Sequence, residues 1–299
     1  MLSQTNCAIA QQKSDSMKDC ECVRFLQEIL PKLHLRWSGF RRVRQQVCKR
    51  LKHRIKELEL EDFSSYSVYL ATHAEEWSVV DACCRITISR FYRDSRVFAQ
   101  LTQELIALAR LATERGDKSL CCWSAGCASG EEVYTLKLIE HFCLARSQFY
   151  LPLDILATDI DEYLLSRASQ GCYKLGTLKE LPQEWIAEAF TINSEQYCIK
   201  PIFKERIRFD RQDIRKEMPN GSFHLILCRN LVFTYFEPTL QREILQQICD
   251  RLLANGILLI GKRESLPSDW IESQLLPGSG DDLYRKIGIA QSKYERGDR

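Results

Sequence analysis

The feature that most constrains the fold is a repeated order of short apolar run, polar or small-residue turn, and helical pattern, beginning near residue 118. The apolar runs are Leu120–Ser124, Asp154–Thr158, Phe223–Cys228 and Ile257–Ile260. Between them, apolar residues recur at intervals of three and four, as on one face of a helix. Short strands that alternate with helices are typical of a parallel sheet covered on both faces. The sequence therefore predicts an α/β fold with a doubly wound sheet.

The segment before this region has a different pattern. Val43, Val47, Leu51, Ile55 and Leu58 follow one another at helical spacing, and no strand-like alternation accompanies them. We expect a small helical domain over 23–85, followed by a larger domain over 86–290 that begins with a helix over about 95–113.

Smaller features complete the expected organisation. A small β excursion is predicted over 190–209, and Asn255–Gly256 is expected to end the helix that follows Pro238. The polar ends, 1–22 and 291–299, are expected to be loose tails. The first of these lacks the basic and apolar parts of a secretory signal.

Composition excludes several classes of protein. Hydrophobic residues make up 45% of the chain and charged residues 27%, as in an ordinary globular protein. No apolar run approaches the roughly 20 residues of a membrane helix, so we expect no membrane insertion. The fourteen cysteines include no CxxC repeat, and the five histidines show no HxxxH or HExxH spacing. Reduced, buried thiols in a cytoplasmic protein without a metal are therefore expected.

Positive charge is concentrated in one place. Residues 36–56 hold nine Lys or Arg and no Asp or Glu, so the rest of the chain sums to −7, which is the net +2 minus 9. On the predicted helix over 41–56 these cations form either a solvated face or a surface that attracts phosphates. Nucleic acid is the less favoured partner, because no aromatic-rich motif for stacking bases accompanies the charge.

The turn after the first apolar run carries the clearest chemical signal. Small residues over 125–130 allow a tight turn close to a ligand, and this sequence is neither GxGxxG nor a phosphate loop. Glu131 and Glu132 then open a helix. They complement the helix dipole, but they would also repel a pyrophosphate and suit an ammonium or sulfonium group. This favours S-adenosylmethionine over NAD.

Polar residues also follow the other predicted strands, at the edge where ligands of such sheets bind. Asp159 is placed to accept hydrogen bonds from ribose hydroxyls, or to cap the next helix, a role that we assign to Asp161. Asp213 is either an acceptor for an adenine amino group or an exposed loop acid. Asn230 follows the strand over 223–228, as a ligand contact or as part of a plain loop.

With these residues in view, the sequence resembles the CheR-type family of S-adenosylmethionine-dependent glutamate O-methyltransferases. Five motifs carry the resemblance in order: Val47–Ile55 with Leu60–Tyr66, Ile88–Asp94, Trp123–Tyr134, Ala157–Asp161 and Leu227–Asn230. The resemblance implies a Rossmann-like methyltransferase sheet, S-adenosylmethionine as cofactor and S-adenosylhomocysteine as product. It also implies that an acidic helical protein, such as a chemoreceptor, docks on the basic helix over 41–56.

The resemblance further assigns the residues that contact the cofactor. These are Thr87, Ser89, Arg93, Gly126, Glu131, Asp159, Asp213, Ile214, Asn230 and Leu231. Arg93 is implied to reach the methionine carboxylate or the substrate acid, with Glu131 near the amino group and Asp159 at the ribose. Asp213 and Ile214 correspond to a pair beside the adenine, and Asn230 and Leu231 to a contact beneath the reacting centre.

The implied chemistry is simple. A glutamate side chain has a reference pKa near 4.3, so it is already an anionic nucleophile at neutral pH and needs no general base. Arg93 and Tyr235 are the expected catalytic residues, because a cation or dipole must replace the water around the carboxylate.

The segments Cys228–Phe236 and Gly261–Leu266 depart from the receptor-methylating pattern, the first by one extra residue. Two alternatives therefore remain open. One is methylation of a small carboxylic acid or another nucleophile, and the other is a cofactor-sensing module without turnover.

Overall fold

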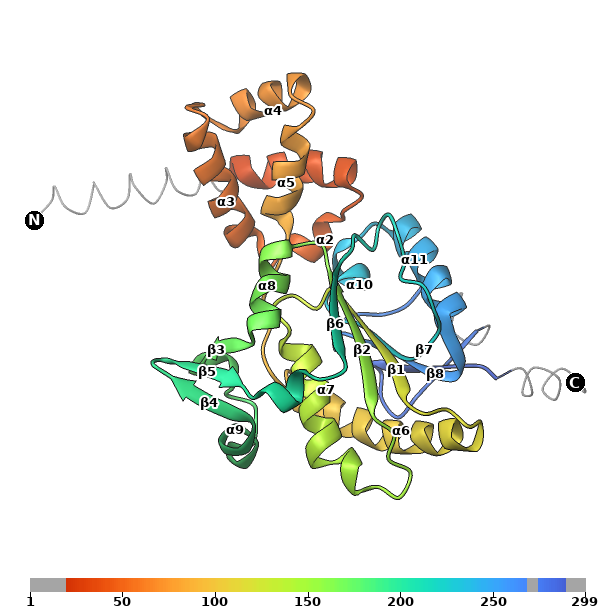
Figure 1. Cartoon of the computed structure of the whole chain (residues 1–299). Coiled ribbons are helices and arrows are strands. Elements are labelled where there is room, and N and C mark those ends of the chain that lie inside the picture. Colours follow the sequence, from red (N-terminus) through yellow and green to blue (C-terminus); the bar gives the residue numbers. More distant parts are fainter. Residues whose placement is uncertain (1–19, 268–273, 289–299) are drawn as a thin grey trace, which may run out of the picture. The chain divides into compact units, whose positions relative to one another are not determined.

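The computed structural model describes residues 20–267 and 274–288, and the chain divides into two compact units (Figure 1). The N-terminal unit runs to Thr87 and also takes in the short segment Tyr235–Glu237. The larger unit comprises Ile88–Thr234 and the chain from Pro238 onward. The division thus falls two residues after the predicted boundary at 85, and it assigns one later segment to the first unit.

The N-terminal unit is helical. Residues 20–29 form a helix, and the elements that follow are η1 (Leu30–Leu33), α2 (Trp37–Phe40), α3 (Arg44–Glu57), α4 (Phe63–Thr72) and α5 (Glu76–Cys84). Helix α3 buries Val47, Leu51 and Ile55, the residues whose spacing predicted the helix. Asp62 begins α4 as part of a capping box, because its carboxylate accepts the Ser65 N–H at 2.8 Å.

Two arginines of α3 are not on a solvated face as the charge pattern suggested. Arg54 donates to both carboxylate oxygens of the buried Glu76 at 2.8 Å, and Tyr66 donates its hydroxyl to the same group at 2.7 Å. Arg50 donates to the main-chain oxygens of Cys83 and Arg85. The exposed part of the basic stretch consists of Arg41, Arg42, Lys49, Lys52 and Lys56.

The larger unit contains a seven-stranded sheet in the order β6-β2-β1-β7-β8-β10-β9. Its strands are β1 (Leu120–Ala125), β2 (Leu153–Asp159), β6 (Ile207–Arg211), β7 (Phe223–Cys228), β8 (Leu252–Ile260), β9 (Leu275–Pro277) and β10 (Leu283–Lys286). The first five strands in this order are parallel, and β10 and β9 add antiparallel pairs at the end. The predicted doubly wound α/β fold is confirmed.

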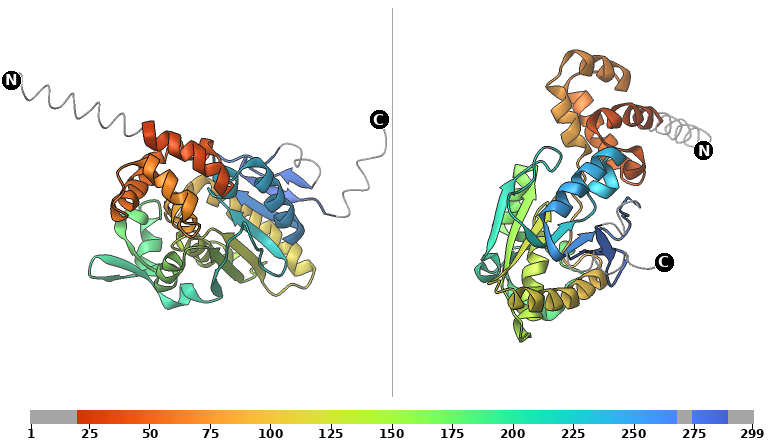
Figure 2. Two further views of the ribbon diagram at one scale, coloured as in Figure 1. Left: turned by 90° about the horizontal axis from the view of Figure 1, so that it is seen from above. Right: turned by 90° about the vertical axis from the view of Figure 1, so that its right-hand side faces the viewer.

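Helices cover both faces of this sheet. The longer ones are α6 (Ser95–Glu114), α7 (Glu131–Phe142), α8 (Glu162–Gln170) and α11 (Pro238–Arg251), with α9 (Gln183–Ala189), α10 (Val232–Tyr235) and the turns η2 (Leu144–Arg146), η3 (Leu175–Thr177) and η4 (Pro201–Lys204) between them. Helices α7 and α8 pack against β2, and α11 lies on the opposite face (Figures 1 and 2). This arrangement explains the nearly continuous burial of β1 and the complete burial of β7.

Two local features differ from the predictions. Ile207–Phe209, expected within the β excursion over 190–209, belong to β6, which pairs with β2 as an edge strand of the main sheet. The strands β4 (Phe190–Asn193) and β5 (Gln196–Ile199) do lie in the predicted range, where they form a small sheet with β3 (Cys172–Lys174). Asn255–Gly256 also does not end helix α11, because it lies inside β8, where the register with β7 shifts and Asn255 adopts a φ of 64°.

The cysteines are not all free thiols as expected. Disulfides join Cys22 to Cys48 and Cys172 to Cys198. Cys172 and Cys198 are direct partners in the β3–β5 register, and a pairing between strands cannot be read from sequence spacing. Nine other cysteines of the described ranges are free thiols: Cys20, Cys83, Cys84, Cys121, Cys122, Cys127, Cys143, Cys228 and Cys249.

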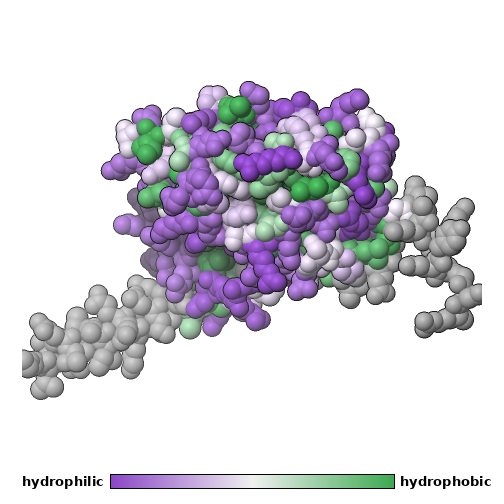
Figure 3. Space-filling model, turned by 90° about the horizontal axis from the view of Figure 1, so that it is seen from below, coloured by the Kyte–Doolittle hydropathy of each residue, from purple (hydrophilic) through white to green (hydrophobic). Residues whose placement is uncertain are grey.

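Figure 3 shows a mainly hydrophilic face on which hydrophobic side chains lie in small separate groups. Among the described residues, no helix is both long and apolar enough to span a membrane. Within the same residues, no cluster of three or more His, Cys, Asp or Glu side chains is suited to a metal ion.

The buried carboxylate of Glu76 generates a prediction about stability. Glu76→Ala removes the shared acceptor of Arg54 and Tyr66, so the free energy of unfolding of the N-terminal unit should fall by about 3 kcal/mol in urea titrations. The hydrogen bond from Arg54 holds the pKa of Glu76 below its ordinary value. This stabilisation should therefore be complete above about pH 4.3 and decline as the pH falls through the lowered pKa.

The matched control is Glu75→Ala, which removes the exposed neighbouring glutamate. It should change stability by less than about 0.5 kcal/mol. Equal losses in the two variants would contradict the importance of the buried network.

Candidate functional site

The strand order locates the edge at which a ligand binds. The chain adds β2 and β6 on one side of β1, and β7 and β8 on the other, so the order reverses between β1 and β7. Ligands of open α/β sheets bind beyond the carboxyl ends of the strands at such a reversal. In this chain the segments that leave those ends begin at Gly126 after β1 and at Arg229 after β7.

The turn after β1 is fixed against β2. The N–H groups of Gly126 and Cys127 both donate to the Thr158 carbonyl, at 2.8 and 3.0 Å. Gly126 has a φ of +73°, and a Cβ on this residue would lie 2.6 Å from Cδ2 of Leu231. Glycine is therefore required here for conformation and for space. The same contact brings together two predicted cofactor residues, Gly126 and Leu231.

Asp159 and Asp161 make different contacts in the structure. Asp161 caps α8 by accepting the N–H groups of Tyr163 and Leu164, which confirms its predicted role. Asp159 ends β2, and its carboxylate accepts the N–H of Ala128 from the β1 turn and the N–H of Asp161, each at 2.9 Å. These bonds fix the carboxylate beside the turn. Its role at the ribose remains a prediction.

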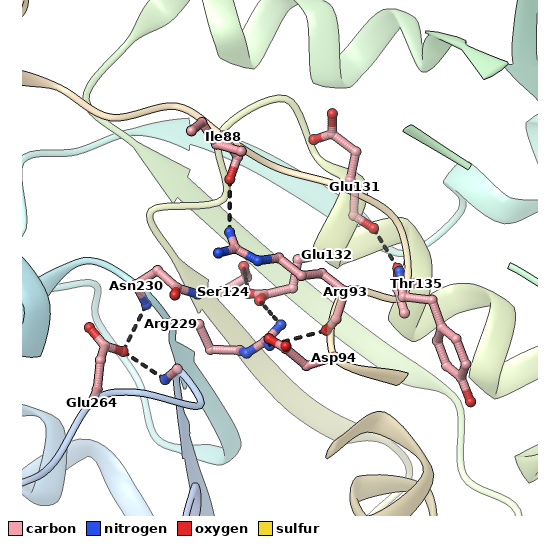
Figure 4. Close-up of polar contacts among 12 residues, drawn as sticks. Ile88, Arg93, Asp94, Ser124, Glu131, Glu132, Thr135, Arg229, Asn230 and Glu264 are labelled. Atoms are coloured by element: carbon pink, nitrogen blue, oxygen red, sulfur yellow. Dashed lines mark hydrogen bonds and ion pairs between the residues drawn. The ribbon is translucent and has the colours of Figure 1, made fainter. Parts of the chain in front are cut away.

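The two glutamates that open α7 point in different directions (Figure 4). Glu131 is 2% exposed, and both its carboxylate oxygens accept the Ser129 hydroxyl at 3.0 Å. Glu132 accepts the Ser124 hydroxyl at 2.9 Å and an N–H of Arg229 at 3.2 Å. Glu131 thus remains beside the turn, whereas Glu132 is part of a second cluster centred on Arg229.

Arg229 was not singled out by the sequence, although it stands in the Cys228–Asn230 motif. Its side chain is 4% exposed, and its guanidinium donates to Glu132, to Asp94 at 2.9 Å and to the Arg93 carbonyl at 3.2 Å. It also lies over the Phe98 ring, 5.0 Å from the centroid. The only available signal was its place directly after an apolar strand.

Arg93 is part of this cluster through its main chain. Its guanidinium donates to the Ile88 carbonyl at 3.0 Å, which folds the segment that also contains Ser89 (Figure 4). The residues on either side, Tyr92 and Asp94, both have positive φ values. The structure therefore joins Arg93 to the carboxyl ends of β1 and β7 through Arg229.

Glu264 is a second buried residue that the sequence did not identify as part of the site. It accepts the N–H of Asn230 at 2.8 Å, the N–H of Gly261 at 2.6 Å and the hydroxyl of Thr234 at 2.6 Å. Burial raises the pKa of Glu264 above its usual value. Asn230 has a φ of 55°, and its N–H bond to Glu264 fixes this turn after β7. The only signal was the altered 261–266 segment.

Asp213 is not the exposed loop acid that was one of its two interpretations. Its side chain is 13% exposed, and its oxygens accept both Nε and Nη2 of Arg215. Ile214 is buried beside it. The neighbouring Gln212 has a buried Oε1 with no hydrogen-bond partner among the described residues. An adenine contact for Asp213 and Ile214 remains a prediction.

Two predicted site residues, Thr87 and Tyr235, belong to the N-terminal unit. There the Tyr235 ring lies 5.0 Å from that of Phe40, and its carbonyl accepts the N–H of Arg36 at 2.8 Å. Their places in catalysis and cofactor binding remain predictions.

The edge at which the strand order reverses thus carries fixed carboxylates, and negative charge suits a ligand that carries a positive charge. The sequence model described as "CheR methyltransferase, SAM binding domain" matches residues 87–278, so the chain belongs to the CheR methyltransferase family. It is a methyltransferase of the chemotaxis CheR type, and S-adenosylmethionine is its cofactor.

Curated relatives agree with this assignment. A chemotaxis protein methyltransferase of Listeria innocua is 34% identical over 187 residues, which cover 62% of this chain and 68% of the relative. Chemotaxis protein methyltransferase 2 of Vibrio cholerae is 29% identical over 228 residues, covering 74% and 77%. An uncharacterised 104.1 kDa protein of Rhodobacter capsulatus is 29% identical over 220 residues, but the match covers only 23% of its length.

The residues at the edge fit this cofactor. Glu131 and Asp159 supply negative charge for a ligand that carries an ammonium and a sulfonium group. The orphaned Oε1 of Gln212 is an acceptor whose burial is costly without a donor, and a nucleoside amino group can supply one.

The contacts of Glu264 generate a prediction. In Glu264→Gln one carboxylate oxygen becomes an NH₂ group that must face a donor, so the free energy of unfolding should fall by about 1–3 kcal/mol. A pKa raised in the folded protein means that the native state binds the proton more tightly, so the Glu264 contribution decreases as the pH rises above about 4.3. The stability difference between wild type and variant, measured by urea unfolding, should decrease accordingly.

Glu243→Gln, at an exposed position of α11, is the control and should leave stability within about 0.5 kcal/mol at every pH. A difference between wild type and Glu264→Gln that grows with pH would contradict the raised pKa.

Proposed function

We propose that the chain methylates glutamate side chains of a protein substrate on the carboxyl oxygen. The observation that carries this proposal is that the main chain of Arg93 is joined, through Arg229, to an edge that carries fixed carboxylates in a CheR-family chain. Fixed acids suit a cationic methyl donor, and an arginine suits an anionic acceptor. Relatives named chemotaxis protein methyltransferases support the same assignment.

The proposed reaction requires alignment rather than proton transfer. S-adenosylmethionine, when bound, supplies an electrophilic methyl group. The acceptor glutamate is already ionised at neutral pH, so no side chain of this protein has to remove a proton. Arg93 pairs with the acid and replaces the water lost from it, Glu131 and Asp159 hold the donor, and most of the rate gain comes from positioning.

The proposed partner is an acidic helical protein in the cytoplasm that docks on α3 and the residues before it. Support comes from the five cations that stay exposed there, Arg41, Arg42, Lys49, Lys52 and Lys56. Arg50 and Arg54 do not contribute to this surface, because their guanidinium groups bond inside the unit. Docking through exposed charges should weaken as ionic strength rises.

A second candidate is methylation of a small carboxylic acid. The altered segment Cys228–Phe236 favours it, because this segment departs by one residue from the receptor-methylating pattern. A cofactor-sensing module without turnover is the third candidate. All three share the cofactor and differ in the acceptor.

Transfer of a labelled methyl group tests the proposal. The chain is incubated with methyl-labelled S-adenosylmethionine and a host lysate, and the protein fraction is then treated with mild base. Label that enters protein and is released as methanol is the expected result, because carboxyl esters hydrolyse in base. Base-stable label would contradict O-methylation, label only in small molecules would favour the second candidate, and cofactor binding without transfer would favour the third.

The ribose assignment gives a separate prediction. Asp159→Ala removes the carboxylate fixed beside the β1 turn, so the affinity for S-adenosylhomocysteine should fall at least 50-fold by calorimetry, a loss of about 2 kcal/mol. Asp210→Ala, which removes an acid of β6 with 44% of its side chain exposed, should bind as the wild type does. Unchanged affinity in Asp159→Ala would remove this residue from the cofactor site.

A further inference from the structure

Arg93 lies between two residues in a strained conformation. Tyr92 has a φ of 52°, and Asp94 has φ and ψ values of 64° and 56°. Both fall in the left-handed region, which residues with a Cβ enter at an energetic cost. Such conformations persist only where surrounding contacts enforce them, and they concentrate at functional sites. The turn over 92–94 therefore needs contacts that hold it.

Thr135 holds the first of these residues. The N–H of Tyr92 donates to the Thr135 hydroxyl oxygen at 2.9 Å, and that hydroxyl donates to the Glu131 carbonyl at 2.7 Å (Figure 4). The second bond orients the hydroxyl so that its lone pair faces Tyr92. Thr135 is completely buried, so water cannot replace the contact if it is lost.

Arg229 holds the second strained residue, Asp94. One amino group of its guanidinium donates both to the Asp94 carboxylate and to the Arg93 carbonyl. The other amino group is bonded to Glu132, and the plane lies over Phe98. The guanidinium is thus fixed from three sides, and its position determines that of the Arg93 main chain.

Both contacts depend on helix α7. Thr135 and Glu132 are three residues apart and lie on the same part of the helix, and Glu131 beside them is a proposed donor-binding acid. The first turns of α7 therefore connect the proposed donor site to the turn that carries Arg93.

We propose that Thr135 and Arg229 are positioning residues, which act on the reaction by holding the strained 92–94 turn and so directing Arg93. The inference rests on the proposed role of Arg93. Without the hydrogen bonds to Thr135 and Arg229, the turn over 92–94 relaxes to ordinary backbone angles. The Arg93 guanidinium then moves away from the position that methyl transfer requires. Small displacements of a group that aligns reactants reduce the rate strongly.

The first test compares two substitutions of Thr135. Thr135→Val keeps the branched shape and removes the hydroxyl, and Thr135→Ser restores it. We expect Thr135→Val to lower the rate of methyl transfer at least 10-fold and Thr135→Ser to recover most of that loss. Thr102→Val is the matched control, because among the described residues the hydroxyl of this buried threonine donates within its own helix, to the Phe98 carbonyl at 2.8 Å. It should lose similar thermal stability without losing transfer.

A double-mutant cycle shows whether Thr135 acts through Arg93. If it does, adding Thr135→Val to Arg93→Ala should lower the rate of methyl transfer by less than a further 2-fold, because the side chain being positioned is already absent. Arg229→Lys keeps the charge but cannot bond Asp94 and the Arg93 carbonyl in the same planar geometry, so it should show the same non-additive loss. Full additivity in both cycles would overturn the proposal.

Hydrogen exchange provides a readout that does not need activity. The amides of residues 91–95 should exchange faster in Thr135→Val than in wild type, and at the wild-type rate in Thr135→Ser and Thr102→Val. Suppose that Thr135→Val leaves exchange and methyl transfer unchanged while Arg93→Ala strongly lowers the transfer rate. That result would overturn the positioning role of Thr135 and leave the proposed function intact. A different result would be faster exchange in Thr135→Val together with a wild-type rate of methyl transfer in Arg93→Ala. It would show that Arg93 takes no part in the reaction and would overturn the positioning role as well.

Discussion

The buried guanidinium of Arg229 is the interaction on which the geometry of the larger unit's site depends. It joins the end of β7 to the first turn of α7 and to the segment that carries Arg93. A charge taken out of water is tolerated only when partners compensate for its lost hydration, and Glu132 and Asp94 do so here. Because three segments share one cation, none of them can shift without disturbing the others. The sheet edge is thereby a preorganised site rather than a set of independent loops.

The carboxylates at this edge of the sheet have distinct roles. Glu132 and Glu264 are structural, since the first neutralises Arg229 and the second binds the backbone after β7. Glu131 and Asp159 lie beside the turn that leaves β1, where negative charge suits a cationic donor. Adjacent glutamates in the sequence therefore differ in role, because successive helix positions point about 100° apart.

Local patterns in the sequence accounted for much of this architecture. The strands β1, β2, β7 and β8 were predicted from apolar runs, and the cap at Asp161 from its position before a helix. These features depend on neighbouring residues, so a single chain segment contains the signal. The doubly wound sheet followed from the repeated strand–helix pattern, whereas the order of its strands was not predicted.

Other features depend on contacts between distant segments and could not be predicted in that way. Arg229 reaches residues more than 90 positions away, and Glu264 binds a backbone N–H 34 positions away. The edge position of Ile207–Arg211 and the Cys172–Cys198 pairing are set by neighbouring strands. Asn255 gave a turn signal, but tertiary pairing placed it in a bulge within β8.

We propose that the cofactor binds beyond the carboxyl ends of β1 and β2, between the turn at Gly126 and the carboxylate of Asp159. A crystal structure of the complex with S-adenosylhomocysteine tests it most directly. The ribose hydroxyls should lie within hydrogen-bond distance of Asp159, and the amino group of the ligand should lie near Glu131. A ligand bound elsewhere, with no contact to either carboxylate, would contradict it.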